Sequence, residues 1–107
     1  MSPTKAATEL PPVPPEVLHF AAENGVKDYL YPVMALANSI FPGRPMTVLL
    51  EGDPEIANDW HIVCEVDVTG LSVEELLAGQ RRWSEGIFQR CPATHVSIFR
   101  FGWTESA

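Results

Sequence analysis

Cysteine is scarce in this chain of 107 residues, and long apolar runs are absent. The two cysteines, Cys64 and Cys91, are too few for the disulfide framework of a small secreted domain, and a reducing compartment would keep both as thiols. No segment approaches the ~20 consecutive apolar residues that a membrane-spanning helix needs. Residues 1–10 also lack the apolar run of a secretory signal peptide. The sequence therefore predicts a cytoplasmic protein without a membrane partner.

Basic residues are also few, because 7 Lys and Arg stand against 14 Asp and Glu and give a formal net charge of -7. A chain of this charge repels phosphate backbones, so we expect no direct nucleic-acid partner. A basic protein partner suits the charge better. The arginines are scattered, and Arg81 and Arg82 are expected to keep the outer face of a helix solvated.

The signatures of common enzymes are missing as well. The chain contains no P-loop, no G-x-G-x-x-G, no G-x-S-x-G and no H-E-x-x-H motif. We therefore expect no cofactor, and a binding role is favoured over catalysis. An active site assembled from acids and histidines of distant segments remains an alternative.

The residues that are present suit one packed core. Apolar residues make up 46% of the chain and charged residues 20%, while the length is too short for two cores of ordinary size. Residues 1–14 are rich in proline, which fixes φ and has no N–H donor, so they are predicted to form an extended arm. Residues 15–104 are predicted to form a single domain, with Pro15 in the first turn of its first helix.

Two helices are predicted in the first half of the chain. Apolar spacing predicts a helix over 16–24, which ends at Gly25 in a left-handed conformation. A second helical pattern runs over 29–40, with Asp28 as N-cap and Pro32 either in the first turn or at the true start. Its larger side chains are expected in the core: Tyr29, Tyr31, Met34 and Phe41.

The second half of the chain alternates between strand and helix patterns. Period-two alternation predicts strands over 46–51 and 60–68, joined by a polar hairpin turn over 52–59. A capping box of Ser72 and Glu75 then begins a third helix, which ends near Cys91-Pro92. The last strand is predicted from about 95 to 103.

The order α-α-β-β-α-β predicts an α+β fold with a three-stranded mixed sheet and helices packed on it. The last strand should be parallel to the second, and a right-handed β-α-β crossover through the third helix could place it beside the first. It carries Val96 and Ile98 on one face and Phe99, Phe101 and Trp103 on the other. A strand that is apolar on both faces indicates a sheet covered on both sides, and a subunit interface would supply the second cover.

Two cysteines and two histidines form a possible zinc set: His61, Cys64, Cys91 and His95. Positions three apart in a regular strand point to opposite faces, so His61 and Cys64 should diverge and no metal site is predicted. Cys91 lies at the C-terminal end of a predicted helix, where the dipole disfavours a thiolate nucleophile.

Acidic residues concentrate on the predicted hairpin: Glu51, Asp53, Glu55, Asp59, Glu65 and Asp67. Such a cluster is a solvated surface, a docking surface for a basic partner, or a site for Mg²⁺ or Ca²⁺. The specific calcium-loop pattern of alternating acids, glycine and a distal Glu is missing.

Several short motifs are distributed along the chain from Val17 to Gly102: Phe20-Ala21-Ala22-Glu23, Phe41-Pro42-Gly43, Asp53-Pro54-Glu55, the strand Ile62 to Val68, Trp83, Pro92 and Phe99-Arg100-Phe101. With these motifs the chain resembles small uncharacterised bacterial proteins. Some of them look like the smaller member of a two-gene pair, which implies an antitoxin-like or accessory partner protein. The resemblance implies no site residues.

The sequence thus predicts a protein-binding domain rather than an enzyme, with no catalytic residue. Its partner is expected to be another protein, a second copy in a homodimer, or both. The candidate interaction surface combines hairpin acids with aromatic residues of the last strand: Glu51, Asp53, Glu55, Asp59, Phe99, Phe101 and Trp103. Two alternatives stay open, namely a small enzyme that uses the acidic hairpin with His61, and a metal-binding module that uses the cysteines and histidines.

Overall fold

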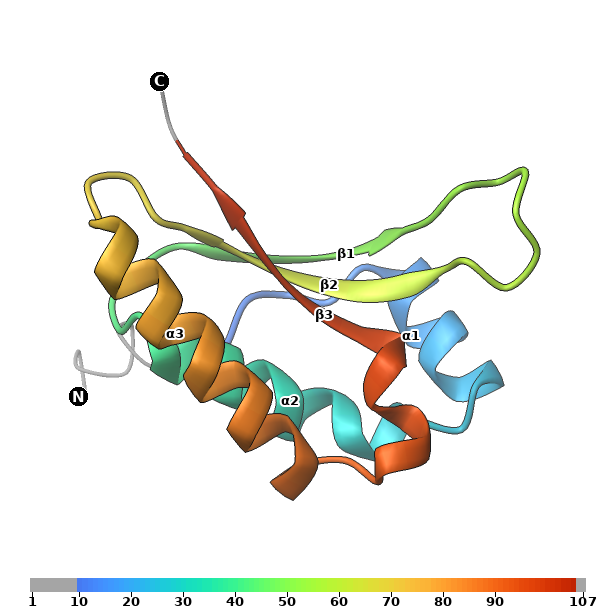
Figure 1. The fold of residues 1–107 in the computed structure, drawn as a ribbon. Helices are drawn as coiled ribbons and strands as arrows, with labels where there is room; N and C mark the ends of the chain where they lie inside the picture. Colours follow the sequence, from blue (N-terminus) through green and yellow to red (C-terminus); the bar gives the residue numbers. More distant parts are fainter. Residues whose placement is uncertain (1–9, 106–107) are drawn as a thin grey trace, which may run out of the picture.

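Three helices lie against one face of a three-stranded sheet in the computed structural model, which describes residues 10–105 (Figure 1). The predicted α+β class and the order α-α-β-β-α-β are confirmed. The elements are α1 (Pro15–Glu23), α2 (Lys27–Ile40), β1 (Met46–Glu51), β2 (His61–Asp67), α3 (Val73–Gly86), β3 (Phe99–Thr104) and two short 3₁₀ helices, η2 (Ile87–Gln89) and η3 (Ala93–Ile98). No helix within residues 10–105 has the length and apolarity needed to cross a membrane.

The sheet is mixed, as predicted. β1 and β2 pair antiparallel as a hairpin, and β2 pairs parallel with β3 after the crossover through α3. The strand order is β1-β2-β3, so the expectation that β3 lies beside β1 was wrong. The 14 residues of α3 return the chain to the nearest free edge of the sheet, which is the far side of β2. A single helix of this kind suffices to connect adjacent parallel strands.

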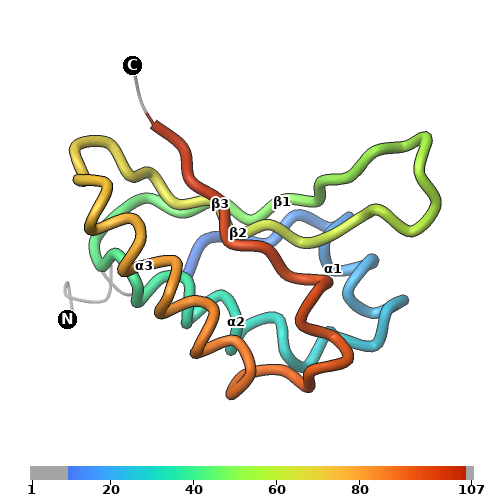
Figure 2. The backbone as a smooth tube through the Cα atoms, viewed as in Figure 1, coloured from blue at the N-terminus to red at the C-terminus, as the bar shows by residue number. Residues whose placement is uncertain are grey.

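The helices cover only one face of the sheet (Figure 2), and cover of the second face by a subunit interface stays a prediction. Residues 93–98 form η3 instead of the first half of a strand, because Pro92 and His95 close a turn through a 2.8 Å backbone hydrogen bond. Val96 and Ile98 therefore do not line the sheet. The second face of β3 instead carries alternate residues of small or polar character: Arg100, Gly102 and Thr104.

The ends of the helices follow the predicted signals with one exception. Pro15 stands in the first turn of α1, and Gly25 follows α1 with a φ of 70°. The capping box of α3 is present, since Ser72 N donates to Glu75 Oε1 over 2.8 Å and Glu75 N donates to Ser72 Oγ over 3.1 Å.

The start of α2 differs from the prediction. The helix begins at Lys27 after Val26, so Asp28 is not its N-cap and Pro32 lies in its second turn. A proline here removes one hydrogen bond to the carbonyl four residues earlier. Of the expected core side chains, Met34 and Phe41 are buried and Tyr29 is half-buried, but Tyr31 is exposed.

A close contact between α2 and α3 holds the helical layer together. An ideal Cβ at Gly79 would overlap with Cζ of Phe41 and approach its Cε1 to 2.9 Å, so only glycine permits this approach. The rings of Phe41 and Trp83 both stack on Phe101, with centroid distances of 6.0 and 5.3 Å. The aromatic stack therefore joins the end of α2, the middle of α3 and β3.

The Gly79→Ala substitution should lower the free energy of unfolding by up to about 2 kcal/mol. Alanine adds about 1 kcal/mol of helix propensity, but overpacking a core contact costs about 1–3 kcal/mol. Urea denaturation measures the difference, and Ser84→Ala at an exposed position of α3 is the control, expected to be neutral or slightly stabilising. A more stable Gly79→Ala protein would contradict the tight contact with Phe41.

Candidate functional site

The β1–β2 hairpin is the most strongly charged part of the molecule. From Met46 to Val68 the chain contains six acidic residues and no lysine or arginine. Its loop extends away from the helical layer at the α1 end of the molecule (Figure 1). Glu51, Asp53 and Glu55 are exposed, and Asp59 is half-buried. The hairpin thus presents a continuous acidic surface.

Two of these acids shape the loop itself. The Asp53 backbone N donates to Asp59 Oδ2 over 2.8 Å, and Asp53 Oδ1 accepts from Glu55 N over 2.9 Å. A Cβ at Gly52 would lie 2.6 Å from the Asp59 carbonyl oxygen, so glycine is required where the chain leaves β1. Asp53 and Asp59 therefore have a structural role beside any role in binding.

A cavity beside the hairpin loop brings together residues that the sequence analysis did not connect. It has a volume of about 370 Å³ and is lined from α1, the hairpin loop and η3 by Phe20, Glu23, Asn24, Asn58, Trp60 and Ile98. Trp60 was predicted to begin β2 on its apolar face, but β2 begins at His61 and Trp60 is 40% exposed. The one signal in the sequence is a tryptophan directly after the Asn58-Asp59 turn.

The aromatic residues proposed on the last strand differ in their access to solvent. Phe99 is only 3% exposed, and Phe101 is half-buried in the stack with Phe41 and Trp83. Phe99 therefore belongs to the core, which corrects its placement on an interaction surface, whereas Phe101 packs against the core and is only partly buried. Trp103 is 39% exposed and stays a candidate.

The cysteines and histidines do not come together. Cys64 is buried under the helices. His61 is three positions earlier in β2 and therefore lies on the opposite face of the strand. Cys91 is buried after α3, and the ring of His95 lies beside Tyr29 at a centroid distance of 6.2 Å. Within residues 10–105, His, Cys, Asp and Glu form no group of three or more that could hold a metal ion.

A second cleft runs between α2 and α3 on the side away from the sheet. Its larger part has a volume of about 480 Å³ and lies between the C-terminal end of α2 and the first half of α3. A smaller part of about 280 Å³ continues toward Gly86 and Gln89. Arg82 lines both parts and donates to the carbonyl oxygen of Ile40 over 2.9 Å. Arg82 is therefore not simply a solvated residue of the outer helix face.

No protein family model, no curated protein and no solved structure matches this chain. The resemblance to small bacterial proteins therefore stays a prediction, and functional arguments depend on the geometry of the chain itself.

Burial makes both thiols poor nucleophiles at neutral pH. It raises the pKa of Cys64 from 9.0 to about 12 and also raises the pKa of Cys91. In the unfolded chain Cys64 ionises above about pH 9, while in the folded chain it stays protonated up to about pH 12. In this window the unfolded state binds fewer protons, so stability falls as the pH rises.

The near-isosteric Cys64→Val variant should lack this pH dependence. Relative to the variant, the wild type should lose about 1 kcal/mol of unfolding free energy for each pH unit above pH 9, until the folded thiol itself ionises. Chemical denaturation of both proteins at a series of pH values measures the difference. Parallel pH profiles would show that the Cys64 thiol is not shielded.

Proposed function

We propose that this protein is a non-enzymatic protein-binding domain whose acidic hairpin docks a basic segment of a partner protein. The observation that carries the proposal is the hairpin from Met46 to Val68, with six acids, no lysine or arginine and an exposed tryptophan at the end of its loop. Surfaces of one charge sign steer an oppositely charged partner and raise the association rate. An accessory role beside a larger partner fits this surface.

The cavity at Trp60 gives the surface an anchor point. Trp60 and Phe20 supply aromatic rings, and Glu23 supplies a carboxylate at the same cavity. A lysine or arginine side chain of the partner would gain cation–π and ionic contacts there. Exposed tryptophans in such pockets are typical energetic centres of protein interfaces.

Binding of a basic peptide should depend on Trp60 and on salt. A labelled Lys/Ala peptide should bind wild-type protein, and an equally long Glu/Ala peptide should not. The Trp60→Ala variant should weaken binding about tenfold or more, and the double variant Glu51→Gln/Glu55→Gln should weaken it mainly through a slower association rate. Fluorescence anisotropy and stopped-flow mixing measure both quantities.

The matched control is Trp103→Ala, because Trp103 is as exposed as Trp60 and lies on β3. This variant should bind the basic peptide like the wild type. If Trp103→Ala lost binding and Trp60→Ala kept it, the interface would be the last strand and the hairpin proposal would be wrong.

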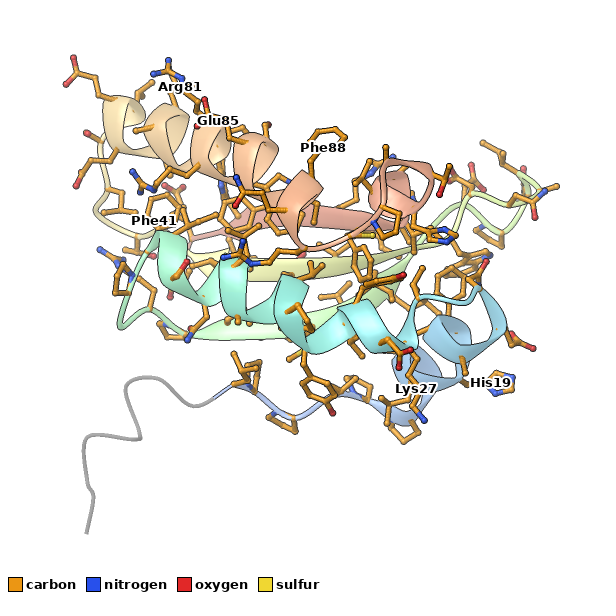
Figure 3. The ribbon with its side chains drawn as sticks, turned by 90° about the horizontal axis from the view of Figure 1, so that it is seen from below. His19, Lys27, Phe41, Arg81, Glu85 and Phe88 are labelled. Carbon is orange, nitrogen blue, oxygen red and sulfur yellow. The ribbon has the colours of Figure 1, made fainter. Side chains whose placement is uncertain are left out.

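Self-association is a second part of the proposal, and α3 and β3 favour it. β3 is an edge strand, and within residues 10–105 it pairs only with β2. Three apolar side chains of α3 and η2 are more than half exposed: Val73, Leu77 and Phe88. Phe88 and Arg81 lie on the side of this helical segment that faces away from α2 (Figure 3). Exposed apolar side chains and a free strand edge are typical of an interface between two copies.

A dimer that forms through the exposed apolar side chains of α3 and η2 and the edge of β3 should dissociate when a charge is placed among these apolar side chains. Light scattering should give the mass of a dimer for the wild type and of a monomer for Leu77→Glu, with an unchanged circular dichroism spectrum. Tyr31→Glu, at an equally accessible position of α2, is the control and should remain dimeric. A wild-type protein that is monomeric at every concentration would refute this part of the proposal.

A further inference from the structure

The larger part of the cleft between α2 and α3 combines an apolar wall with two cations. Its apolar wall includes Ile40, Phe41 and Leu71, and its polar side chains are Arg44, Glu75 and Arg82. A volume of about 480 Å³ lies within the range of small-molecule sites, which are mostly apolar with a few fixed polar groups. Phe41 stands at the end of α2 that faces this part of α3 (Figure 3).

Both arginines are held in place by backbone carbonyl groups. Arg44 Nη1 donates to the Thr69 carbonyl oxygen over 2.6 Å, and Arg82 Nη2 donates to the Ile40 carbonyl oxygen over 2.9 Å. Each of these bonds uses one of the five N–H donors of a guanidinium group. Each guanidinium group is thus anchored at one N–H before a ligand binds, which lowers the ordering cost of binding.

Charge distinguishes this cleft from the rest of the molecule. In the larger part of the cleft, two guanidinium groups and one carboxylate leave one net positive charge, in a chain whose formal charge is -7, while Glu85 lines the smaller part together with Arg82. The hydrogen bond from the Ser72 backbone, and then that from the Ser72 side chain, lower the pKa of Glu75, with a further contribution from the charge of Arg44. Glu75 therefore stays ionised, and its carboxylate accepts a hydrogen bond from the Ser72 backbone N–H at the start of α3.

We propose that this cleft binds a small monocarboxylate with an apolar body, whose carboxylate contacts Arg44 and Arg82 while the body lies against Phe41 and Leu71. A planar carboxylate matches the fork of guanidinium donors. One negative charge balances the net charge of the cleft, whereas a phosphate dianion would be repelled more strongly by Glu75. This site is separate from the hairpin and does not depend on the proposed protein partner.

Octanoate is the probe, and its neutral and cationic analogues octanol and octylamine are the ligand controls. Isothermal titration calorimetry on the full chain should show saturable octanoate binding at least tenfold tighter than octanol, and no binding of octylamine. Amide chemical shifts should change around Arg44 and Arg82 and not at the hairpin. Equal affinity for octanoate and octanol would overturn the role of the arginines, and absence of saturable octanoate binding would overturn the site.

Adjacent arginines on α3 provide matched variants. Arg82→Gln and Arg44→Gln should each weaken octanoate binding about tenfold. Arg81→Gln should leave it unchanged, because Arg81 points away from α2 (Figure 3). Equal losses in Arg81→Gln and Arg82→Gln would show a general charge effect and overturn the proposal.

Arg82 also satisfies a carbonyl at the end of α2, so its replacement lowers stability as well. Ala78→Glu avoids this difficulty, since Ala78 lines the cleft from α3 and its replacement removes no side-chain hydrogen bond. This variant should keep the circular dichroism spectrum of the wild type and lose octanoate binding through repulsion. A folded Ala78→Glu protein that binds octanoate like the wild type would also overturn the proposal.

Discussion

The absence of a side chain at Gly79 is the constraint on which most of the helical layer depends. It lets Phe41 approach the backbone of α3, and Phe41 in turn stacks on Phe101 beside Trp83. One point of contact therefore fixes the end of α2, the position of α3 and the docking of β3. Gly86 repeats the arrangement about two turns later, where a Cβ would lie 2.7 Å from a methyl carbon of Leu36. Close packing of this kind leaves little freedom for the angle between the helices.

The charges of the molecule are separated by this architecture. The hairpin carries six acids and no lysine or arginine, whereas the larger part of the cleft between α2 and α3 is lined by two arginines and one glutamate. Mutual repulsion among the hairpin acids costs little stability, because three of the six are exposed, the other three are only half-buried, and water and salt screen them. The helical layer, in contrast, uses its arginines to satisfy backbone carbonyls. The two surfaces thus differ in the sign of their charge.

Local signals in the sequence predicted the helix ends well, but they predicted the start of the last strand wrongly. The capping box at Ser72 and the glycine after α1 depend on residues close in sequence, and the structure confirms both. The strand predicted from residue 95 was wrong, because Val96 and Ile98 alternate like strand residues while a turn at Pro92 imposes 3₁₀ geometry. Alternation alone does not distinguish the two.

The candidate sites were predicted only in part, for a related reason. The acidity of the hairpin is visible in composition, but the cavity at Trp60 needs Phe20 and Ile98, which only the tertiary fold brings close. The same holds for Arg44 and Arg82, which seemed scattered until α3 crossed back over the end of α2. Phe99 and Phe101 appeared as interface residues because an aromatic strand has the same composition whether it faces a partner or its own core.

The hairpin loop has a further consequence for how this fold can evolve. Its shape depends on bonds within the loop, between Asp53, Glu55 and Asp59, and not on the contact between α2 and α3. Substitutions at outward positions such as Ile56 would therefore alter the recognition surface without disturbing the packing that folds the chain. The outward side chains of the loop and the packing of the helical layer can therefore vary independently of each other.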